Sequence, residues 1–264
     1  MVYLGGWALA LTLSLLGALG TAELYRLAEV RSVRPLAIPG LAGAVFFPIG
    51  LLLVPGGDLL DGRWAALLLA AWLIIIMLAA MRARTPDERP LEAVAVTAFG
   101  ALYAGALPGF LLWVRQSPMV PNRWAATWLV FLPLALTWIC DSLAMMGGSM
   151  FGGRKLAPVL SPKKTWSGAV VGAIGAVILG PVYGLLVLER VGVVIPVLAL
   201  VLVGLGIGTL GQIGDVAESL FKREAGVKDS GTFFPGHGGV LDRLDSLYWG
   251  IPVTVMILRA FRAI

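Results

Sequence analysis

The sequence predicts an all-α integral membrane protein with about eight to nine transmembrane helices. Hydrophobic residues make up 59% of the 264-residue chain and charged residues only 13%, with a mean hydropathy of +0.91. An ordinary soluble domain carries about 25% charged residues. Apolar runs of about 20 residues, the length that crosses a bilayer, recur along the whole chain. We therefore expect one transmembrane domain over residues 1–264, with N-terminal helices at 1–120 and the polar motifs at 121–264.

The apolar runs define eight expected spans. They lie at approximately residues 3–22, 36–54, 64–81, 93–114, 124–146, 168–188, 193–214 and 240–258. The first run lacks the basic residues that open a signal peptide, and seven further runs follow it, so we interpret it as a span. An even number of spans places both termini on the same side of the membrane.

Two of these runs have unusual lengths. The run that begins at Val193 is long for one crossing and is rich in glycine, so a break there would raise the count to nine. The run Leu247–Leu258 is too short to cross about 30 Å of hydrocarbon at about 1.5 Å per residue. It must therefore begin near Val240, which draws Asp242 and Asp245 into the edge of the membrane. Ionisable groups at that depth are candidates for function.

Basic residues are distributed unevenly over the loops between these spans. If the N-terminus lies outside, most of the 20 Lys and Arg residues face the cytoplasm. These are Arg26, Arg31, Arg34, Arg82, Arg84, Arg89, Arg154, Lys155, Lys163, Lys164, Lys222, Arg223, Lys228 and Arg243. Positive charge retains a loop in the cytoplasm, so the polar motifs are expected on that face. The same distribution accounts for the net charge of +5 without nucleic-acid binding, and the single cysteine, Cys140, cannot form an intrachain disulfide.

Three polar segments interrupt the apolar sequence. Asp141–Gly153 places a carboxylate at the end of a span, before a glycine-rich turn. Ser161–Gly168 reads SPKKTWSG, in which a Ser-Pro pair opens a turn ahead of two lysines. In the third segment Asp215 and Glu218 share one helical face. That segment continues through Ser219–Asp245, which reads SLFKREAGVKDSGTFFPGHGGVLDRLD and is rich in both acids and bases.

The residue types in these segments suit a polyphosphate substrate. Magnesium prefers oxygen ligands and takes only one or two protein carboxylates, and Asp215 and Asp242 stand at helix ends where they could share one ion. The turn Pro235–Gly239 would let backbone amides approach a phosphate closely. Several basic residues would neutralise more charge than one phosphomonoester carries, so we expect a polyphosphate and a second anion. They are Lys163, Lys164, Lys222, Arg223, Lys228 and Arg243.

Each segment also has a purely structural interpretation. Asp141 could pair with an arginine at a helix end, and the two adjacent lysines could anchor their loop to lipid headgroups. Asp242 and Asp245 could form ion pairs with neighbouring arginines, and His237 could be structural. The gathering of all these groups at one membrane face favours a functional site. The GxGxxG pattern at Gly206–Gly211 lies in an apolar span and not after a strand, so it does not indicate a dinucleotide fold.

The third segment resembles the C-terminal motif of the phosphatidate cytidylyltransferases, also called CDP-diacylglycerol synthases. The matching pattern is Ser219-x-Phe221-Lys222-Arg223, then Lys228-Asp229-x-Gly231, then Pro235-x-His237-Gly238-Gly239-Val240-x-Asp242-Arg243-Leu244-Asp245. Asp141-Ser142 and the run Ser161–Trp166 are similar to two further pieces of that family. The resemblance covers about the C-terminal half of the chain. Ser167, Met145 and Ser149 stand where the family commonly has Glu, Tyr and Arg, so no role is carried over to them.

The resemblance implies the reaction of CTP with phosphatidate to give CDP-diacylglycerol and pyrophosphate, with Mg²⁺ as cofactor. It implies that Asp215 and Asp242 hold the metal, with Asp245 and Asp141 as further ligands or supporting acids. The implied catalytic residues are Asp215, Asp242, Lys163, Lys164 and Arg243. The implied substrate-binding residues are Ser161, Thr165, Lys222, Arg223, Lys228, Asp229, His237, Gly238, Gly239 and Asp141. Phosphatidate would enter from the cytoplasmic leaflet of the inner membrane, and the glycine-rich spans are compatible with a homodimer.

Two other classes of protein share some of these features. The CDP-alcohol phosphotransferases need Asp-Gly-x-x-Ala-Arg followed by Gly-x-x-x-Asp-x-x-x-Asp, and this sequence has no such run. An ion or lipid transporter would also use acids and glycine-broken helices. It would place the acids near mid-span and show an internal repeat, whereas the acids here gather at one membrane face. The sequence therefore favours a nucleotidyltransferase that acts on a membrane lipid phosphate.

Overall fold

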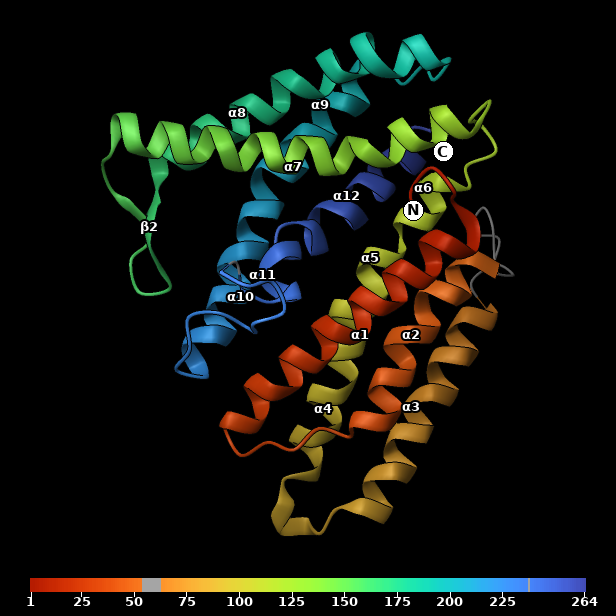
Figure 1. The fold of residues 1–264 in the computed structure, drawn as a ribbon, viewed down its shortest axis with the longest axis vertical. Coiled ribbons are helices and arrows are strands. Elements are labelled where there is room, and N and C mark those ends of the chain that lie inside the picture. Colours follow the sequence, from red (N-terminus) through yellow and green to blue (C-terminus); the bar gives the residue numbers. More distant parts are fainter. Residues whose placement is uncertain (54–62, 237) are drawn as a thin grey trace. The chain divides into compact units, whose positions relative to one another are not determined.

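The computed structural model describes residues 1–53, 63–236 and 238–264 and consists almost entirely of helices (Figure 1). The sheet found in these residues is one two-stranded hairpin. The chain forms two compact units. We call residues 6–113 and 221–243 the first unit, and residues 2–5, 114–220 and 244–264 the second unit. The single domain divided near residue 120 remains a prediction, and the motif at 221–243 packs with the N-terminal helices.

The first unit is a bundle of apolar helices. Its elements are α1 (Gly6–Val30), α2 (Ala37–Leu53), α3 (Arg63–Ala83), η3 (Pro86–Glu88), α4 (Pro90–Gly100), η4 (Ala101–Ala106), α5 (Leu107–Gly109) and α11 (Val240–Leu244). α1 packs against α2 and the π-helical η4. A Cβ on Gly105 would lie 2.5 Å from the Ala44 Cα, so a glycine is needed where η4 meets α2. The Tyr25 hydroxyl donates to the Thr97 carbonyl at 2.7 Å and joins α1 to α4.

The second unit is built on long helices and the hairpin. Its elements are α7 (Arg123–Phe151), β1 (Lys155–Ala157), β2 (Ser161–Thr165), α8 (Trp166–Tyr183), η5 (Gly184–Leu188), η6 (Glu189–Val191), α9 (Val197–Gly206), η7 (Ile207–Gly211) and α12 (Leu247–Ala260). α6 (Leu111–Arg115) and α10 (Gln212–Glu224) each continue from one unit into the other. The side chain of Asn122 accepts a hydrogen bond from the Ala125 N–H at 3.0 Å and caps α7. Thr165 caps α8 in the same way.

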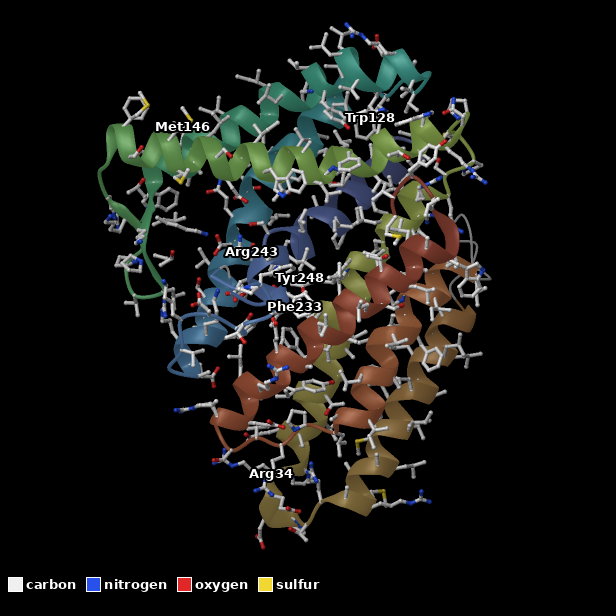
Figure 2. All side chains as sticks on the ribbon, in the orientation of Figure 1. Arg34, Trp128, Met146, Phe233, Arg243 and Tyr248 are labelled. Atoms are coloured by element: carbon white, nitrogen blue, oxygen red, sulfur yellow. The ribbon has the colours of Figure 1, made fainter. Side chains whose placement is uncertain are left out.

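Among the described residues, six helices are long and apolar enough to cross a membrane. They are Gly6–Val30, Ala65–Ala83, Pro90–Arg115, Arg123–Phe151, Trp166–Val191 and Val197–Glu224. α2 has 17 residues and α12 has 14, so the predicted count of eight to nine spans is not confirmed. Large apolar side chains such as Trp128 and Met146 of α7 are exposed (Figure 2), as expected of a surface that faces lipid. The prediction of an all-α, multi-pass membrane protein is confirmed.

Two expectations about the spans need correction. The break considered for the run that starts at Val193 does not occur, because Val197–Glu224 is one continuous helix. At its glycines it forms the π-helical turn η7, a widened turn inside an α-helix. The predicted span 240–258 is divided, because α11 ends at Leu244 and α12 begins at Leu247. Asp242 therefore lies in the short helix α11 and Asp245 at the junction before α12, and neither lies inside one long helix.

The polar segments of the second unit also differ from the predicted turns. The glycine-rich stretch after Asp141 is helical, because α7 continues through it to Phe151. Gly147 is required there by packing, since a Cβ on it would lie 2.6 Å from the Val171 Cβ of α8. The Ser-Pro pair lies in β2, and the turn precedes it at residues 158–160. The two lysines of this segment therefore stand on a strand.

Gly172 tests the close packing of α7 on α8. Gly172→Leu should lower the apparent melting temperature, because an added Cβ lies 2.8 Å from the Cys140 carbonyl oxygen and overpacking costs about 1–3 kcal/mol. The matched control is Gly50→Leu in α2, where an added Cβ meets nothing within 4 Å beyond its own helix backbone. Tryptophan fluorescence of the purified proteins in detergent gives both temperatures. Equal temperatures for the two variants would contradict this packing.

Candidate active site

The C-terminal motif of the first unit begins where α10 ends. Gly226 adopts a φ of +71°, and its N–H donates to the Arg223 carbonyl. The Val227 N–H donates to the Lys222 carbonyl. This pair of bonds is the Schellman arrangement, which ends a helix at a left-handed glycine. Lys222 is thereby fixed in the last turn of α10, and the following chain leads to α11 with Asp242.

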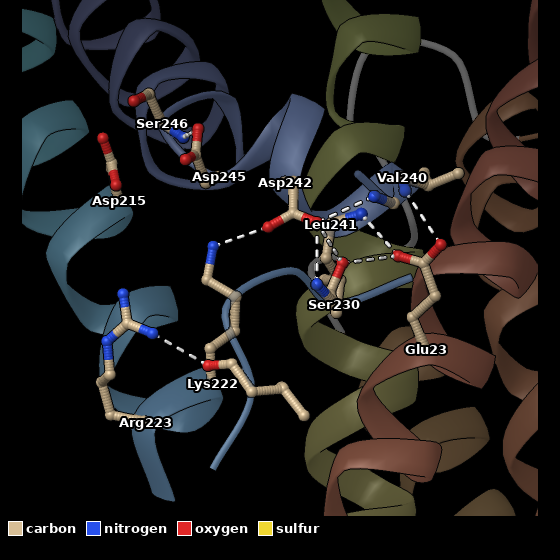
Figure 3. A network of polar contacts seen from close by, with 12 residues as sticks. Glu23, Asp215, Lys222, Arg223, Ser230, Val240, Leu241, Asp242, Asp245 and Ser246 are labelled. Atoms are coloured by element: carbon tan, nitrogen blue, oxygen red, sulfur yellow. Dashed lines mark hydrogen bonds and ion pairs between the residues drawn. The ribbon is translucent and has the colours of Figure 1, made fainter. Parts of the chain in front are cut away.

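Asp242 is the centre of a polar network in the first unit (Figure 3). Its Oδ1 accepts a hydrogen bond from the Lys222 Nζ at 2.6 Å. Its Oδ2 accepts three more at 2.8 Å, from the Ser230 N–H, the Ser230 hydroxyl and the Gly239 N–H. Burial raises the pKa of Asp242, but the bonds from Lys222, Gly239 and Ser230 outweigh it and hold the pKa below its usual value. Asp242 is therefore an anion held by four donors, one of them a cation.

The glycine turn of the motif lies against this carboxylate. Gly238 has a φ of +81°, and a Cβ added to it would lie 2.6 Å from Asp242 Oδ2. The Phe234 N–H donates to the Gly238 carbonyl at 2.9 Å and closes the turn. In this structure the Gly239 N–H donates a hydrogen bond to Asp242 Oδ2. Contact of the turn with a phosphate remains a prediction, and His237 lies outside the described residues.

A second cluster of charged groups forms in the second unit. Lys164 of β2 makes an ion pair with Asp215 of α10. Asp141 of α7 and Asp245, which follows α11, lie close enough to Asp215 and Lys164 to act on them electrostatically. The Ser246 N–H donates to Asp245 Oδ1 at 2.6 Å and orients that carboxylate (Figure 3). The predicted residues Asp141, Lys164, Asp215 and Asp245 are thus brought together within one unit.

The donor set of the second cluster is of the type that a hard divalent cation prefers. It offers carboxylate oxygens from Asp141, Asp215 and Asp245, which are the hard oxygen ligands that such a cation takes. Within residues 1–53, 63–236 and 238–264, no three His, Cys, Asp or Glu side chains are already arranged as a metal-binding group. In this structure the Asp215 carboxylate is paired with the Lys164 ammonium group. The predicted sharing of one ion by Asp215 and Asp242 joins residues of different units and remains a prediction.

The other predicted site residues lie around these two clusters. Thr165 is buried and accepts a hydrogen bond from the Gly168 N–H at 3.1 Å, so its side chain serves as a helix cap. Arg223 donates to the Val227 carbonyl at 2.9 Å. Ser161 is half-buried on β2. Four further residues are exposed and available to solvent or ligand: Lys163, Lys228, Asp229 and Arg243.

Glu23 belongs to the network of the first unit, and sequence reasoning missed it. It lies on α1, is only 3% exposed, and accepts hydrogen bonds from Ser230, Val240 and Leu241. The predicted first span ended at residue 22, which placed Glu23 in a loop. An acid inside an apolar helix is a functional candidate, so a longer first span would have drawn attention to it.

The fold and these clusters define a class: a multi-pass membrane protein with paired lysines and carboxylates at its polar motifs. A family model described as "Cytidylyltransferase family" matches residues 1–261. The chain is 37% identical over 232 residues to the phosphatidate cytidylyltransferase of Brucella abortus biovar 1, covering 87% of this chain and 77% of that one. It is 28% identical over 248 residues to that of Bacillus subtilis, covering 94% and 88%. It is 30% identical over 258 residues to that of Chlamydia pneumoniae, covering 97% of this chain and 83% of that one.

The chain therefore belongs to the cytidylyltransferase family. The family match extends over nearly the whole chain, whereas the motifs that carried the resemblance lie in its C-terminal half. The N-terminal helices are thus part of the same family fold and include the helix that supplies Glu23.

The Lys222–Asp242 pair provides a test of the first cluster. Both side chains are at most 10% exposed, and removing either one breaks a buried ion pair, which destabilises the fold. We expect the effects of Lys222→Met and Asp242→Asn on unfolding free energy to be non-additive, with a coupling of about 0.5–3 kcal/mol in the double variant. The unfolding free energies of the parent, the two single variants and the double variant are measured in mixed micelles titrated with SDS.

The matched control is the exposed pair Arg89–Glu92, whose atoms are 3.5 Å apart with side chains 55% and 53% exposed. Surface pairs of this kind contribute about 0–1 kcal/mol. Strict additivity at Lys222 and Asp242, equal to that of the control pair, would contradict a buried, coupled ion pair.

Proposed function

We propose that this protein transfers the cytidylyl group of CTP to phosphatidate, giving CDP-diacylglycerol and pyrophosphate. The observation that carries the proposal is that two motif lysines, Lys164 and Lys222, are each paired with a motif aspartate. Cations held in this way are pre-positioned for phosphate groups. The relatives that this chain matches over most of its length are named phosphatidate cytidylyltransferase. No observation favours the alternatives, a transporter or a CDP-alcohol phosphotransferase.

The reaction joins two phosphate groups. An oxygen of the phosphatidate phosphate attacks the α-phosphorus of CTP, a new P–O bond forms, and the bond to the β-phosphate oxygen breaks to release pyrophosphate. A phosphomonoester is already largely ionised near neutral pH, so the attacking oxygen needs no dedicated general base. What the protein must supply is alignment and neutralisation of charge. We assign this work to Lys163, Lys164, Lys222, Arg223 and Arg243.

Mg²⁺ is proposed as the cofactor, with Asp215 and Asp245 as its ligands and Asp141 as a supporting acid. A bound divalent cation would neutralise the polyphosphate and polarise its oxygens. Asp242 is proposed as a further ligand of the metal. In the structure its Oδ1 accepts a hydrogen bond from the Lys222 Nζ, so a metal ion bound to that oxygen would replace this bond. The remaining substrate contacts are proposed for Ser161, Thr165, Lys228, Asp229, His237, Gly238 and Gly239.

We further propose that the protein lies in the inner membrane, with its polar motifs facing the cytoplasm and phosphatidate entering from the cytoplasmic leaflet. The excess of basic residues in the loops that carry the motifs supports this orientation. The glycine faces once considered for a homodimer pack within the second unit, where Gly168 lies against Ala144 and Gly204 against Ala176. They therefore give no support to a dimer.

Asp215→Asn tests the proposed chemistry. In detergent with phosphatidate and Mg²⁺, the parent should convert radiolabelled CTP to a lipid-extractable product, and EDTA should stop the reaction until Mg²⁺ is restored. Asp215→Asn should lower the rate by at least about 100-fold, since even supporting residues of a metal site cost about 10–100-fold. Glu189→Gln, an exposed acid on η6, is the control and should retain the parental rate. Full activity of Asp215→Asn would contradict the assigned role.

Cysteine labelling tests the proposed orientation. Val159 in the hairpin turn is 83% exposed, and Arg190 lies at the opposite end of the helix Trp166–Val191. The native Cys140 is only 1% exposed and should stay unlabelled. In intact cells a membrane-impermeant maleimide should label Arg190→Cys, and it should label Val159→Cys only after the membrane is opened. The reverse pattern would show that the motifs face outward.

A further inference from the structure

Glu23 makes contacts that tie the first helix to the C-terminal motif. Its Oε1 accepts a hydrogen bond from the Val240 N–H at 2.9 Å. Its Oε2 accepts one from the Leu241 N–H at 2.9 Å and one from the Ser230 hydroxyl at 2.9 Å. These partners lie more than 200 residues away in the sequence. All four residues belong to the first unit, and Figure 3 shows the Glu23 carboxylate directed at the start of α11.

Two glycines of the motif leave room for this carboxylate. A Cβ on Gly231 would lie 2.5 Å from Glu23 Oε1. A Cβ on Gly239 would collide with Glu23 Oε2 and with the Ser230 hydroxyl. Neither glycine has a positive φ, so backbone conformation does not demand them. The Glu23 carboxylate therefore occupies the space that a side chain at either position would enter.

Glu23 and Asp242 divide the donors of the same segment between them. The Gly239 N–H donates to Asp242, and the next two amides, of Val240 and Leu241, donate to Glu23. The Ser230 hydroxyl lies 2.9 Å from Glu23 Oε2 and 2.8 Å from Asp242 Oδ2. It carries one hydrogen and donates to only one of them at a time. The position of Asp242 is therefore coupled to that of Glu23.

A carboxylate suits this place for a physical reason. The first amides of a helix have no partner within the helix, and those of α11 are buried with Glu23. Hydrogen bonds to an ionised acceptor are about twice as strong as neutral ones. A glutamine would present one carbonyl oxygen and one NH₂ group, so in the observed geometry either the Val240 N–H or the Leu241 N–H would face a donor instead of an acceptor. The observed contacts therefore require both carboxylate oxygens.

We propose that Glu23 is a positioning residue for the reaction: it holds Ser230 and the start of α11 so that Asp242 and its partner Lys222 stand in their working geometry. This inference rests on the proposed function. It assigns a role in the chemistry to α1, a helix that carries none of the recognised motifs.

Kinetics of Glu23→Gln and Ser230→Ala test the proposal. Glu23→Gln should lower kcat per folded protein by about 10–100-fold, the usual effect of losing a residue that orients a reacting group, with a small change in the KM for CTP. Because both residues act on the same segment, the double variant should be scarcely worse than the worse single variant. If Glu23→Gln does not fold, Ser230→Ala alone carries the test and should also lower kcat.

The matched control is Ser14→Ala, which removes another hydrogen bond of α1, from the buried Ser14 hydroxyl to the Val45 carbonyl at 2.8 Å. It should lower stability without lowering kcat. Hydrogen exchange followed by mass spectrometry gives a readout that does not depend on activity. The peptide covering residues 228–245 should exchange faster in Glu23→Gln than in the parent, and it should be unchanged in Ser14→Ala.

Four results would overturn the proposal. These are parental kcat in Glu23→Gln, additive effects of Glu23→Gln and Ser230→Ala, losses of kcat that match Ser14→Ala, or unchanged exchange in the 228–245 peptide. A parent that makes no CDP-diacylglycerol would instead overturn the proposed function, and with it any role of Glu23 in that reaction. The exchange result would still show whether Glu23 holds the segment, so the two failures are distinguishable.

Discussion

The need to satisfy carboxylates among apolar helices governs the arrangement of the motifs. An ionised carboxylate removed from water costs several kcal/mol unless it is paired and hydrogen-bonded. In the first unit Asp242 accepts from the Lys222 Nζ and the Ser230 and Gly239 amides, Glu23 accepts from the Val240 and Leu241 amides, and the Ser230 hydroxyl donates to one or the other acid. Because most of these donors are backbone amides of one segment, the two acids fix the path of the chain from Ser230 to α11. The glycines of the motif follow from that path.

In the second unit a lysine side chain supplies the charge that compensates the carboxylates. Lys164 reaches Asp215 from a hairpin strand, and Asp141 and Asp245 lie within its electrostatic range. The helix α7, which carries Asp141, packs closely on α8 through glycines, as at Gly172 beside Cys140. Both units therefore hold a lysine beside an aspartate in a partly buried setting. Such pairs can exchange their partner for a phosphate or a metal ion, which is what a nucleotidyltransferase needs.

The sequence predicted the membrane class, the family and the lysines and aspartates that form the two clusters, but several local features depended on contacts that it does not display. Gly147 and the glycines near 208 suggested a turn and a break, yet close packing on α8 keeps both stretches helical. Glu23 escaped notice because its partners are remote in the chain.

Transfer of label from CTP tests the central claim most directly. The purified protein would be incubated with phosphatidate and Mg²⁺, in one tube with CTP labelled at the α-phosphorus and in another with CTP labelled at the γ-phosphorus. If the phosphatidate oxygen attacks the α-phosphorus, the α label should enter the lipid extract and the γ label should leave as pyrophosphate. A γ label in the lipid would indicate a kinase, and no label in the lipid from either tube would contradict nucleotidyl transfer.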